Sequence, residues 1–305
     1  MTSPVRPTIV WRFGDGKAGH ENQSRGLLES LARLRAVKTV EVNPLPAHTL
    51  FASQLLGCPA SWQPLPTPDL LVGAGHRTHL SLLSAGRFRG GKTIVLMRPS
   101  LPLSFFDLCL IPAHDDPPRA TNILATRGVL NRIQTATAPD PHQGLLLIGG
   151  TSTHFGWDNA QLLAQITTIL AADSAMQWTL TTSRRTPASF LGALDTLAHR
   201  IHVVPVTATT PDWLPQQLAQ AGQVWVTADS VSMIYESLTA GAAVGILEVP
   251  CKRTNRVSRG LRQLASEGWI TTFESWQKHV HLQRPPQAFN EAERCAHWIH
   301  QQWLT

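Results

Sequence analysis

Short apolar runs separated by amphipathic stretches recur along the whole chain. In the first half, these runs predict strands at 8–13, 38–42, 69–75, 92–97, 107–112 and 122–126. Between the first two runs, helical spacing places four leucines on one face, namely Leu27, Leu28, Leu31 and Leu34. Strands that alternate with helices form parallel sheets covered on both faces. The first half of the chain is therefore predicted to be an α/β domain.

The alternation stops between 131 and 144 and then begins again. This stretch, NRIQTATAPDPHQG, contains two prolines and no apolar period, which is typical of a linker. After it, strands are predicted at 145–150, 177–182, 202–206, 223–229 and 243–249, with helices at 158–171, 188–199, 212–221 and 230–240. A last amphipathic helix at 290–303 opens with Asn290 and Glu293 at capping-box spacing.

The two halves together predict an α/β protein of two Rossmann-like domains that face each other across a cleft. We expect the first domain at 1–134, the linker at 135–143 and the second domain at 144–289. The C-terminal helix, at 290–305, is expected to pack back on the first domain.

Positive charge is concentrated in the first half of the chain. Of 26 Lys and Arg and 20 Asp and Glu residues, 15 basic and 9 acidic ones precede residue 142, whereas the remainder holds 11 of each. This excess suits an acidic ligand or an anionic membrane face, although a solvated basic surface is the plainer alternative. The basic residues are not interleaved with aromatic ones in a recognisable binding module, so we expect no nucleic-acid partner.

The sequence also bears on the compartment. No run approaches the ~20 apolar residues that cross a bilayer, and the N-terminus leads straight into a strand, so we expect no signal peptide. The four cysteines are scattered and are expected to be buried thiols, namely Cys58, Cys109, Cys251 and Cys295. We expect a cytoplasmic protein, with peripheral binding to the inner face of the membrane as a further option.

A glycine pattern after the first strand resembles that of dinucleotide-binding turns. Gly14, Gly16 and Gly19 match G-x-G-x-x-G, and Glu41 follows about 20 residues on. The turn, however, contains Asp15 and Lys17 and runs into the polar sequence HENQ, where nicotinamide enzymes pack small apolar residues. A short-chain epimerase is excluded too, because it needs Tyr-x-x-x-Lys and Tyr235 is the only tyrosine and is followed by Thr239. We therefore expect no nicotinamide and no other cofactor.

Two further motifs have the wrong context. GRFRGGKT at 86–93 fits the phosphate-binding loop pattern, but it precedes a strand instead of opening a helix. HDD at 114–116 lacks the Asp-x-Asp spacing of metal-dependent sugar transferases, and no helix contains His-x-x-x-His. No metal site is expected.

Polar residues follow two neighbouring strands of the second half. Gly149, Gly150, Thr151 and Ser152 come directly after the first of them, where free amides and hydroxyls can bind a diphosphate without a metal. Arg184 and Arg185 follow the next strand, where they can neutralise a departing diphosphate. The alternatives are a plain strand–helix turn and ordinary surface arginines.

The segment 224–250 reads as strand, polar turn, helix and strand. Asp229 and Ser230 form the turn, and the apolar face of the helix consists of Val231, Ile234, Tyr235 and Leu238. Ser232 and Glu236 share a different face, where the carboxylate can accept hydrogen bonds from ribose hydroxyls. A solvated helix position is the alternative for Glu236.

These motifs resemble those of GT-B glycosyltransferases, in particular the lipid-linked N-acetylglucosaminyltransferase of peptidoglycan synthesis. The resemblance includes the glycine-rich turn from Gly16 to His20, the Gly149–Ser152 turn, and the Ser230, Glu236 and Ala240–Gly241 segment. More specifically, GDGKAGHENQ, GAGHRT, TTSRRTP and TADSVSM, in that order, resemble the mitochondrial-fission (elongated-mitochondria) family and its bacterial relatives.

The resemblance implies a GT-B-like fold and a transfer of sugar from a nucleoside-diphosphate sugar on the second domain to an acceptor on the first. His20 is the expected general base because histidine titrates near neutral pH, and Asp15 is the reserve candidate. The residues expected to hold an anionic, lipid-linked acceptor are Gly16, Lys17, Gly19, His76 and Arg77.

Retaining GT-B enzymes contain Glu-x7-Glu, but Val244 stands eight residues after Glu236. We therefore expect an inverting, metal-independent reaction. Two alternatives stay open: a non-catalytic nucleotide-binding or membrane-surface adaptor on the same fold, and a sugar-nucleotide 2-epimerase.

Overall fold

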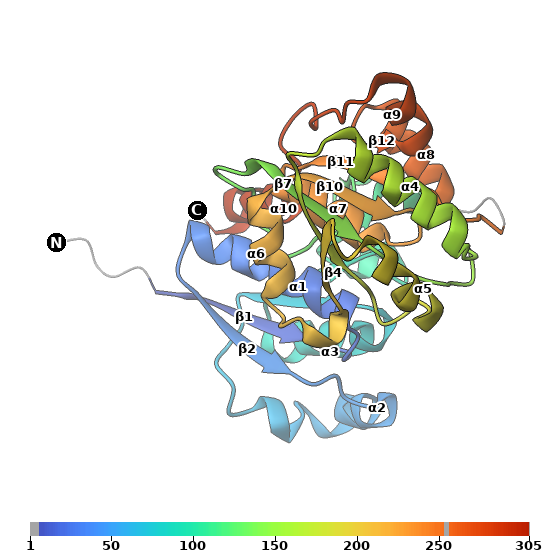
Figure 1. Ribbon diagram of the computed structural model, residues 1–305. Helices are drawn as coiled ribbons and strands as arrows, with labels where there is room; N and C mark the ends of the chain where they lie inside the picture. Colours follow the sequence, from blue (N-terminus) through green and yellow to red (C-terminus); the bar gives the residue numbers. More distant parts are fainter. Residues whose placement is uncertain (1–5, 253–255, 305) are drawn as a thin grey trace. The chain divides into compact units, whose positions relative to one another are not determined.

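The computed structural model describes residues 6–252 and 256–304. The chain forms two compact units, one made of Met1–Arg132 with Glu291–Thr305 and the other of Ile133–Asn290 (Figure 1). We call them unit 1 and unit 2. Both are α/β units built on a parallel six-stranded sheet, as predicted.

The sheet of unit 1 has the strand order β2-β1-β3-β4-β5-β6. Its strands are β1 (Thr8–Phe13), β2 (Val37–Val42), β3 (Leu70–Ala74), β4 (Lys92–Leu96), β5 (Leu108–Pro112) and β6 (Ile123–Thr126). The helices are α1 (Ala18–Leu34), α2 (Ala47–Leu56), α3 (His79–Arg89) and α10 (Glu291–Trp303), with short 3-10 turns between them. All six residues of β1 are buried, because helices cover both faces of the sheet.

Alternate residues of β1 enter two different cores. Val10 packs with Leu27 and Leu31 of α1, while Trp11 packs on the opposite face with Trp62. The C-terminal helix belongs to the first of these cores, since Cys295 and Ile299 of α10 pack there against α1. The prediction that the last helix packs back on the first domain is confirmed.

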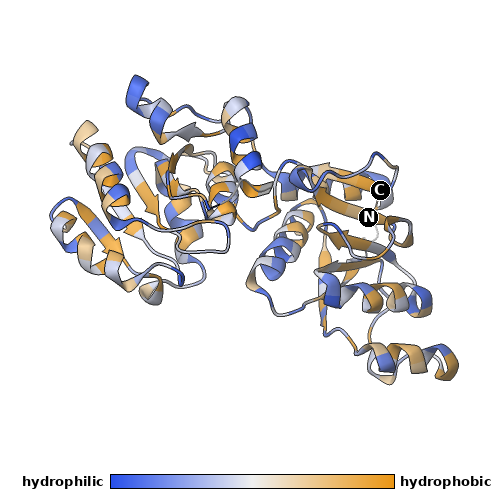
Figure 2. Cartoon of the chain, turned by 90° about the vertical axis from the view of Figure 1, so that its right-hand side faces the viewer, coloured by the Kyte–Doolittle hydropathy of each residue, from blue (hydrophilic) through white to orange (hydrophobic). Residues whose placement is uncertain are grey.

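The sheet of unit 2 has the order β12-β11-β10-β7-β8-β9. Its strands are β7 (Asp140–Leu147), β8 (Gln177–Thr181), β9 (Ile201–Val204), β10 (Ala221–Thr227), β11 (Ala243–Leu247) and β12 (Thr271–Thr272). The helices are α4 (Asn159–Ala172), α5 (Ala188–Ala193), α6 (Trp213–Gln220), α7 (Val231–Ala240), α8 (Arg256–Ser266) and α9 (Phe273–His279). Figure 2 shows apolar residues along the strands inside each unit.

Each sheet has one point at which the strand order changes direction. In unit 1 this point lies between β1 and β3, and in unit 2 it lies between β7 and β10. Open parallel sheets bind their ligands at the carboxyl ends of the strands at such a point, because the loops on either side diverge there. The loops after these four strands are therefore the first places to look for a site.

Some elements differ from the sequence-based expectation. The strand β7 begins at Asp140, inside the stretch 135–143 expected to be a linker, because Asp140 pairs with Ala221 of β10. Of the cysteines, Cys109 and Cys295 are buried as expected, but Cys251 is exposed and Cys58 is half-buried. Among the described residues, no helix is long and apolar enough to cross a membrane.

Candidate functional site

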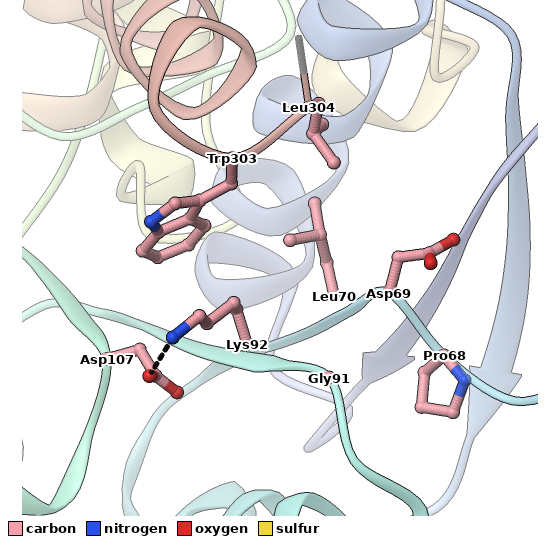
Figure 3. Close-up of a pocket in the computed structure, with 8 residues that line it drawn as sticks. All are labelled: Pro68, Asp69, Leu70, Gly91, Lys92, Asp107, Trp303 and Leu304. Atoms are coloured by element: carbon pink, nitrogen blue, oxygen red, sulfur yellow. Dashed lines mark hydrogen bonds and ion pairs between the residues drawn. The ribbon is translucent and has the colours of Figure 1, made fainter.

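A hollow of about 460 Å³ lies at the amino ends of the strands of unit 1 (Figure 3). Its two carboxylates are already engaged in the fold. Asp107 accepts from Lys92 Nζ at 3.0 Å and from the backbone N–H of Thr93 at 2.9 Å. Asp69 pairs with Arg6 and accepts from the N–H of Ile9. Asp69 and Asp107 thus hold loops to the amino ends of the strands. We therefore look for a functional site at the carboxyl ends of the strands.

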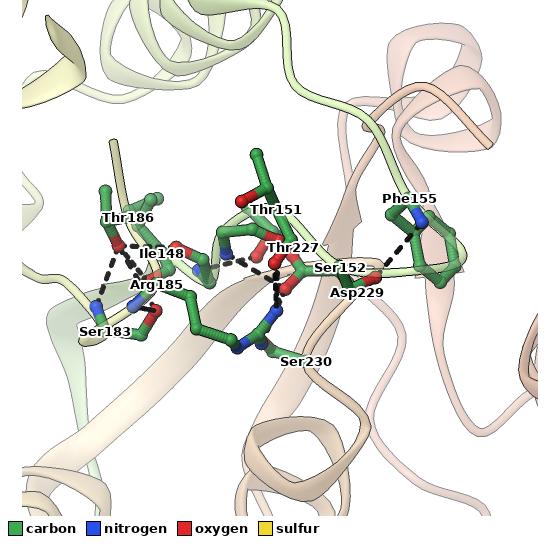
Figure 4. A network of polar contacts seen from close by, with 12 residues as sticks. Ile148, Thr151, Ser152, Phe155, Ser183, Arg185, Thr186, Thr227, Asp229 and Ser230 are labelled. Carbon is green, nitrogen blue, oxygen red and sulfur yellow. Dashed lines mark hydrogen bonds and ion pairs between the residues drawn. The ribbon is translucent and has the colours of Figure 1, made fainter. Parts of the chain in front are cut away.

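At the carboxyl edge of unit 2, three strand ends bring polar residues together (Figure 4). Gly149 and Gly150 follow β7, Arg185 follows β8, and Asp229 and Ser230 follow β10. Asp229 is the centre of this cluster, because its Oδ2 accepts from Gly150 N–H at 2.9 Å, Arg185 Nη2 at 2.8 Å and Ser230 Oγ at 3.1 Å. These five residues, which the sequence predicts to belong to one site, lie together in the structure.

The Asp229 carboxylate is fully buried, with 0% of its side chain exposed. Its second oxygen, Oδ1, is also buried and has no hydrogen-bond partner. A buried carboxylate is stable only when donors compensate its charge, and here Arg185 supplies the opposite charge. The cluster therefore has unused acceptor capacity at its centre.

The two arginines after β8 differ in their surroundings. Arg185 folds back onto the loop, where its Nη1 donates to the carbonyl oxygens of Gly150 at 3.0 Å and Thr151 at 3.1 Å. Arg184 is exposed and makes no hydrogen bond or ion pair with any described residue. Arg185 thus organises the turn, and Arg184 is the cation that remains available to an anion.

Gly149 and Gly150 must be glycines, because neighbouring atoms leave no room for a Cβ at either position. A Cβ on Gly149 would lie 2.1 Å from Ser230 Oγ, and one on Gly150 would lie 2.1 Å from the carbonyl oxygen of Arg185. The amides of these glycines are not free, which corrects the expectation from the sequence. Gly149 N–H donates to Thr227 Oγ1 at 2.8 Å, and Gly150 N–H donates to Asp229, because the turn is held by its own side chains.

The loop that follows Gly150 is held by its own Ser152 and by Lys252, which lies far along the chain. Ser152 Oγ accepts from the N–H groups of His154 and Phe155, so this hydroxyl stabilises the loop. Lys252 Nζ donates to the carbonyl oxygen of Ser152 at 3.0 Å. Thr151 is exposed. The sequence reading missed Lys252, which lies 100 residues from the loop it contacts.

The helix α7 begins at the same edge, directly after Ser230. Ile234, Tyr235 and Leu238 are buried, as the apolar stripe predicted. Ser232 is exposed and Glu236 is half-buried on the other side of the helix. The first turn of a helix presents backbone N–H groups and partial positive charge, which favours an anion there.

At the carboxyl edge of unit 1, the loop after β1 carries an acid–histidine pair. His20 Nδ1, on the first turn of α1, lies 2.8 Å from Asp15 Oδ2, and the Asp15 side chain has 0% exposure. The other Asp15 oxygen accepts from Lys17 N–H at 3.1 Å. Burial raises the pKa of Asp15, but the hydrogen bonds from Lys17 and His20 outweigh it, so the pKa lies below its ordinary value. Asp15, the reserve candidate for the general base, lies within hydrogen-bond distance of His20, the first candidate.

Gly75, directly after β3, packs against the Asp15–His20 pair. It has φ +87°, and a Cβ there would lie 2.4 Å from His20 Nδ1 and 2.7 Å from Asp15 Oδ2. Only glycine adopts this conformation without strain and leaves room for the two side chains. Gly75 was not among the expected site residues. Its neighbours His76 and Arg77 are exposed at the same strand end.

Gly16 and Gly19, in the turn after β1, are surrounded by open space. Gly16 has φ +79° and requires glycine for that reason, but no atom lies within 4 Å of a Cβ placed on Gly16 or Gly19. Both are exposed, as is Lys17. Any close approach to them must come from a ligand.

Ion pairs around the buried Arg12 side chain support this turn. Arg12 of β1 is 3% exposed and pairs with Glu21 of α1 and with Glu41 of β2, each at 2.5 Å. Burial lowers the pKa of Arg12, but the hydrogen bonds and charges of Glu41 and Glu21 raise it above its ordinary value. Glu41 is therefore bound to Arg12, which argues further against the ribose-binding role that a dinucleotide site would give it. Glu21 is next to His20 in α1, so this network fixes the start of the helix.

No group of three or more His, Cys, Asp and Glu side chains within 6–252 and 256–304 could hold a metal ion. The candidate chemistry of the described residues consists of the Asp15–His20 pair in unit 1 and the Asp229–Arg185 cluster in unit 2.

Comparison with known proteins gives one family and several structures. A model of the family described as "Mitochondrial fission ELM1" matches residues 18–303. An uncharacterized protein of Rickettsia prowazekii (strain Madrid E) is 23% identical over 295 residues, which cover 79% of this chain and 83% of the relative.

Two solved structures of similar fold cover nearly all of the chain. The UDP-GlcNAc 2-epimerase from Methanocaldococcus jannaschii has a TM-score of 0.60 at 11% identity and covers 96% of this chain and 99% of its own. MurG from Acinetobacter baumannii has a TM-score of 0.51 at 12% identity, and the aligned region covers 97% of this chain and 100% of MurG. At such identities the likeness establishes the GT-B-like fold with two Rossmann-like domains.

Proposed function

The chain belongs to the mitochondrial fission ELM1 family, and we propose that it is a glycosyltransferase that takes its sugar from a nucleoside-diphosphate donor. The observation that carries the proposal is the Asp229–Arg185 cluster at the point where the strand order of unit 2 reverses. Nucleotides bind to open parallel sheets at this position. MurG and the UDP-GlcNAc 2-epimerase, which share the fold, support a sugar nucleotide as the ligand class.

In the proposed donor complex, the exposed Arg184 guanidinium pairs with the diphosphate and the Thr151 hydroxyl donates to it. The first turn of α7, with Ser232, adds backbone N–H groups and a hydroxyl beside the same anion. Glu236 accepts hydrogen bonds from the ribose hydroxyls. Asp229, Arg185, Gly149 and Gly150 are positioning residues that hold the loops. Gly150 N–H and Arg185 Nη2 donate to Asp229, and Gly149 N–H donates to Thr227.

The proposed reaction assigns the acceptor to unit 1. His20 Nε2 takes the proton of the acceptor hydroxyl as its oxygen bonds to the anomeric carbon. The bond between that carbon and the diphosphate oxygen breaks, and the negative charge that develops on the diphosphate is stabilised by Arg184. Asp15 holds His20 through Nδ1 and stabilises the imidazolium that forms. No metal takes part, and attack from the opposite face inverts the anomeric centre.

The exposed cations near His20 suit an anionic acceptor. Lys17 lies at the start of α1 and His76 and Arg77 follow β3, so all three stand at the carboxyl edge of the unit 1 sheet. We propose a phosphate-bearing, lipid-linked acceptor for this surface. The open space above Gly16 and Gly19 leaves room for its sugar.

The fold shared with the UDP-GlcNAc 2-epimerase favours epimerisation at C2 of a sugar nucleotide as the second candidate. One experiment separates the two reactions. The protein is incubated in deuterated water with UDP-, GDP- and CMP-sugars, with and without a polyprenyl-phosphate-linked acceptor. Nucleotide release that requires the acceptor supports transfer, and deuterium at C2 without an acceptor supports epimerisation. If neither occurs with any donor, the enzymatic proposal is wrong.

A further inference from the structure

The helix α2 exposes more apolar surface than it buries. Phe51, Leu55 and Leu56 are 69%, 91% and 86% exposed, whereas only Leu50 and Ser53 of this helix are buried. An exposed apolar face of this kind is unusual for a solvated helix and indicates a surface that is covered by a partner.

The exposed apolar residues are concentrated in one segment. Five of the six exposed large apolar side chains in the described part of the chain lie between 42 and 106, namely Phe51, Leu55, Leu56, Leu80 and Phe105. The sixth, Val280, lies in unit 2. Leu80 is on α3, which packs against α2, and Leu45, two residues before α2, donates its N–H to Ser81 Oγ of α3 at 2.9 Å. The apolar residues on α2 and α3 therefore belong to neighbouring helices.

The charges of this segment complement an anionic surface. Residues 43–68 contain no Asp, Glu, Lys or Arg, so burying the tip of α2 in an apolar medium desolvates no full charge. From 42 to 106, the only acidic residue is Asp69, which is paired with Arg6. Of the five basic residues in this range, Lys92 is paired with Asp107, Arg89 and Arg98 donate to backbone carbonyl oxygens, and Arg77 and Arg87 are exposed. Unit 1 as a whole has sixteen Lys and Arg against ten Asp and Glu, whereas unit 2 has ten of each.

We propose that the exposed face of α2 docks on an anionic lipid bilayer. A short helix with one apolar face lies in the bilayer interface with that face among the acyl chains, and nearby cations contact the headgroups. α2 has ten residues, which is too short to span a bilayer but sufficient to lie in its interface. Phe51, Leu55 and Leu56 enter the bilayer, and Arg87 of α3, which is exposed, faces anionic lipid.

This membrane surface goes beyond the proposed reaction and stands whether or not the protein transfers a sugar. Phe51, Leu55 and Leu56 are not among the residues that form the Asp15–His20 pair or the Asp229–Arg185 cluster. Failure of the membrane test therefore leaves donor binding intact, and donor binding is measured separately by titration without vesicles.

The test is co-sedimentation of the whole protein with phosphatidylcholine vesicles, with and without phosphatidylglycerol. We expect binding that requires phosphatidylglycerol and weakens as salt is raised. Leu55→Ser combined with Leu56→Ser should reduce vesicle binding at least tenfold, since each removes an apolar side chain from the bilayer. Arg87→Gln should reduce it about fivefold. Val280→Ser, which removes an apolar side chain of unit 2 that is 61% exposed, should leave it unchanged.

Circular dichroism and thermal unfolding check that the double variant is folded, as its exposed positions lead us to expect. The proposal is wrong if the wild type does not sediment with anionic vesicles, or if the double variant binds as well as the wild type. It is also wrong if light scattering shows a wild-type dimer that the double variant converts to monomer, because α2 would then be covered by a second copy of the chain.

Discussion

His20 Nδ1 lies 2.8 Å from Oδ2 of Asp15, and the carboxylate of Asp15 is fully buried. With Nδ1 engaged in this way, Nε2 is the ring nitrogen left for a substrate. The geometry is that of a histidine base oriented by an acid, as in hydrolases that use a catalytic triad. It makes Asp15 a positioning residue for His20.

Asp15→Asn tests this relationship. The amide keeps the size of the side chain but removes the charge that stabilises the imidazolium, so we expect the rate of acceptor-dependent nucleotide release to fall by about 10²- to 10⁴-fold. Donor affinity, measured by titration, should stay unchanged. Equal loss of donor affinity and rate would show that Asp15 has only a structural role.

The same carboxylate predicts a pH dependence of stability. The pKa of Asp15 in the folded protein lies below the ordinary value of 3.8, so the unfolded chain takes up the proton first as pH falls. The contribution of Asp15 to the free energy of unfolding is complete above pH 3.8 and is lost as pH falls through the folded pKa. Urea unfolding between about pH 5 and about pH 3 should therefore show a smaller loss of stability for Asp15→Asn than for the wild type. An exposed control, Asp195→Asn, should keep the wild-type slope.

Gly75→Ala and Gly90→Ala form a matched pair; Gly90 directly follows α3, and no atom lies within 4 Å of a Cβ placed on it. Both glycines have positive φ, so alanine strains the backbone at both positions by about 1 kcal/mol. Only at Gly75 does the Cβ collide with His20 and Asp15. We expect backbone strain to lower the stability of both variants by a similar, modest amount. Only Gly75→Ala should also lower turnover, by at least tenfold. If both variants are equally active, Gly75 does not hold the His20 pair in place.

In unit 2, Gly150→Ala can be compared with Gly192→Ala. The Cβ of the first would lie 2.1 Å from a backbone oxygen of Arg185, whereas nothing lies within 4 Å of the second, which is in α5. Gly150→Ala should reduce the free energy of unfolding by about 2 kcal/mol or more, and Gly192→Ala should leave it unchanged or raise it by up to about 1 kcal/mol. Chemical denaturation measures both. Equal stability of the two variants would contradict the tight packing between the β7 and β8 turns.

The sequence predicted the sheets better than the contacts between loops. Continuous apolar runs such as β1 and β10 identify buried parallel strands, and the polar residues that follow them were placed at the correct strand ends. By contrast, β12 has only two residues, and α2 has an apolar outer face that obscures its helical period. Neither produces a pattern that can be read from a single sequence.

The contacts that build the candidate site are long-range, and for this reason the sequence did not reveal them. Gly75 meets His20 across 55 residues, and Lys252 reaches Ser152 across 100. Asp229 reads as an exposed turn residue, yet Arg185 and Gly150 bury it completely. The amides of Gly149 and Gly150 were expected to be free, but they donate to Thr227 and Asp229, about 80 residues further along the chain.

Donor binding by unit 2 is tested most directly by calorimetric titration of the whole protein with UDP, GDP and CMP. We expect at least one of them to bind with a Kd of about 1 mM or tighter. Arg184→Ala should weaken it about 10- to 100-fold, because a charge-assisted hydrogen bond is lost. Arg284→Ala, which removes another exposed arginine of unit 2, should have no effect. Absence of binding by the wild type, or equal affinity of the Arg184→Ala variant, would contradict the account.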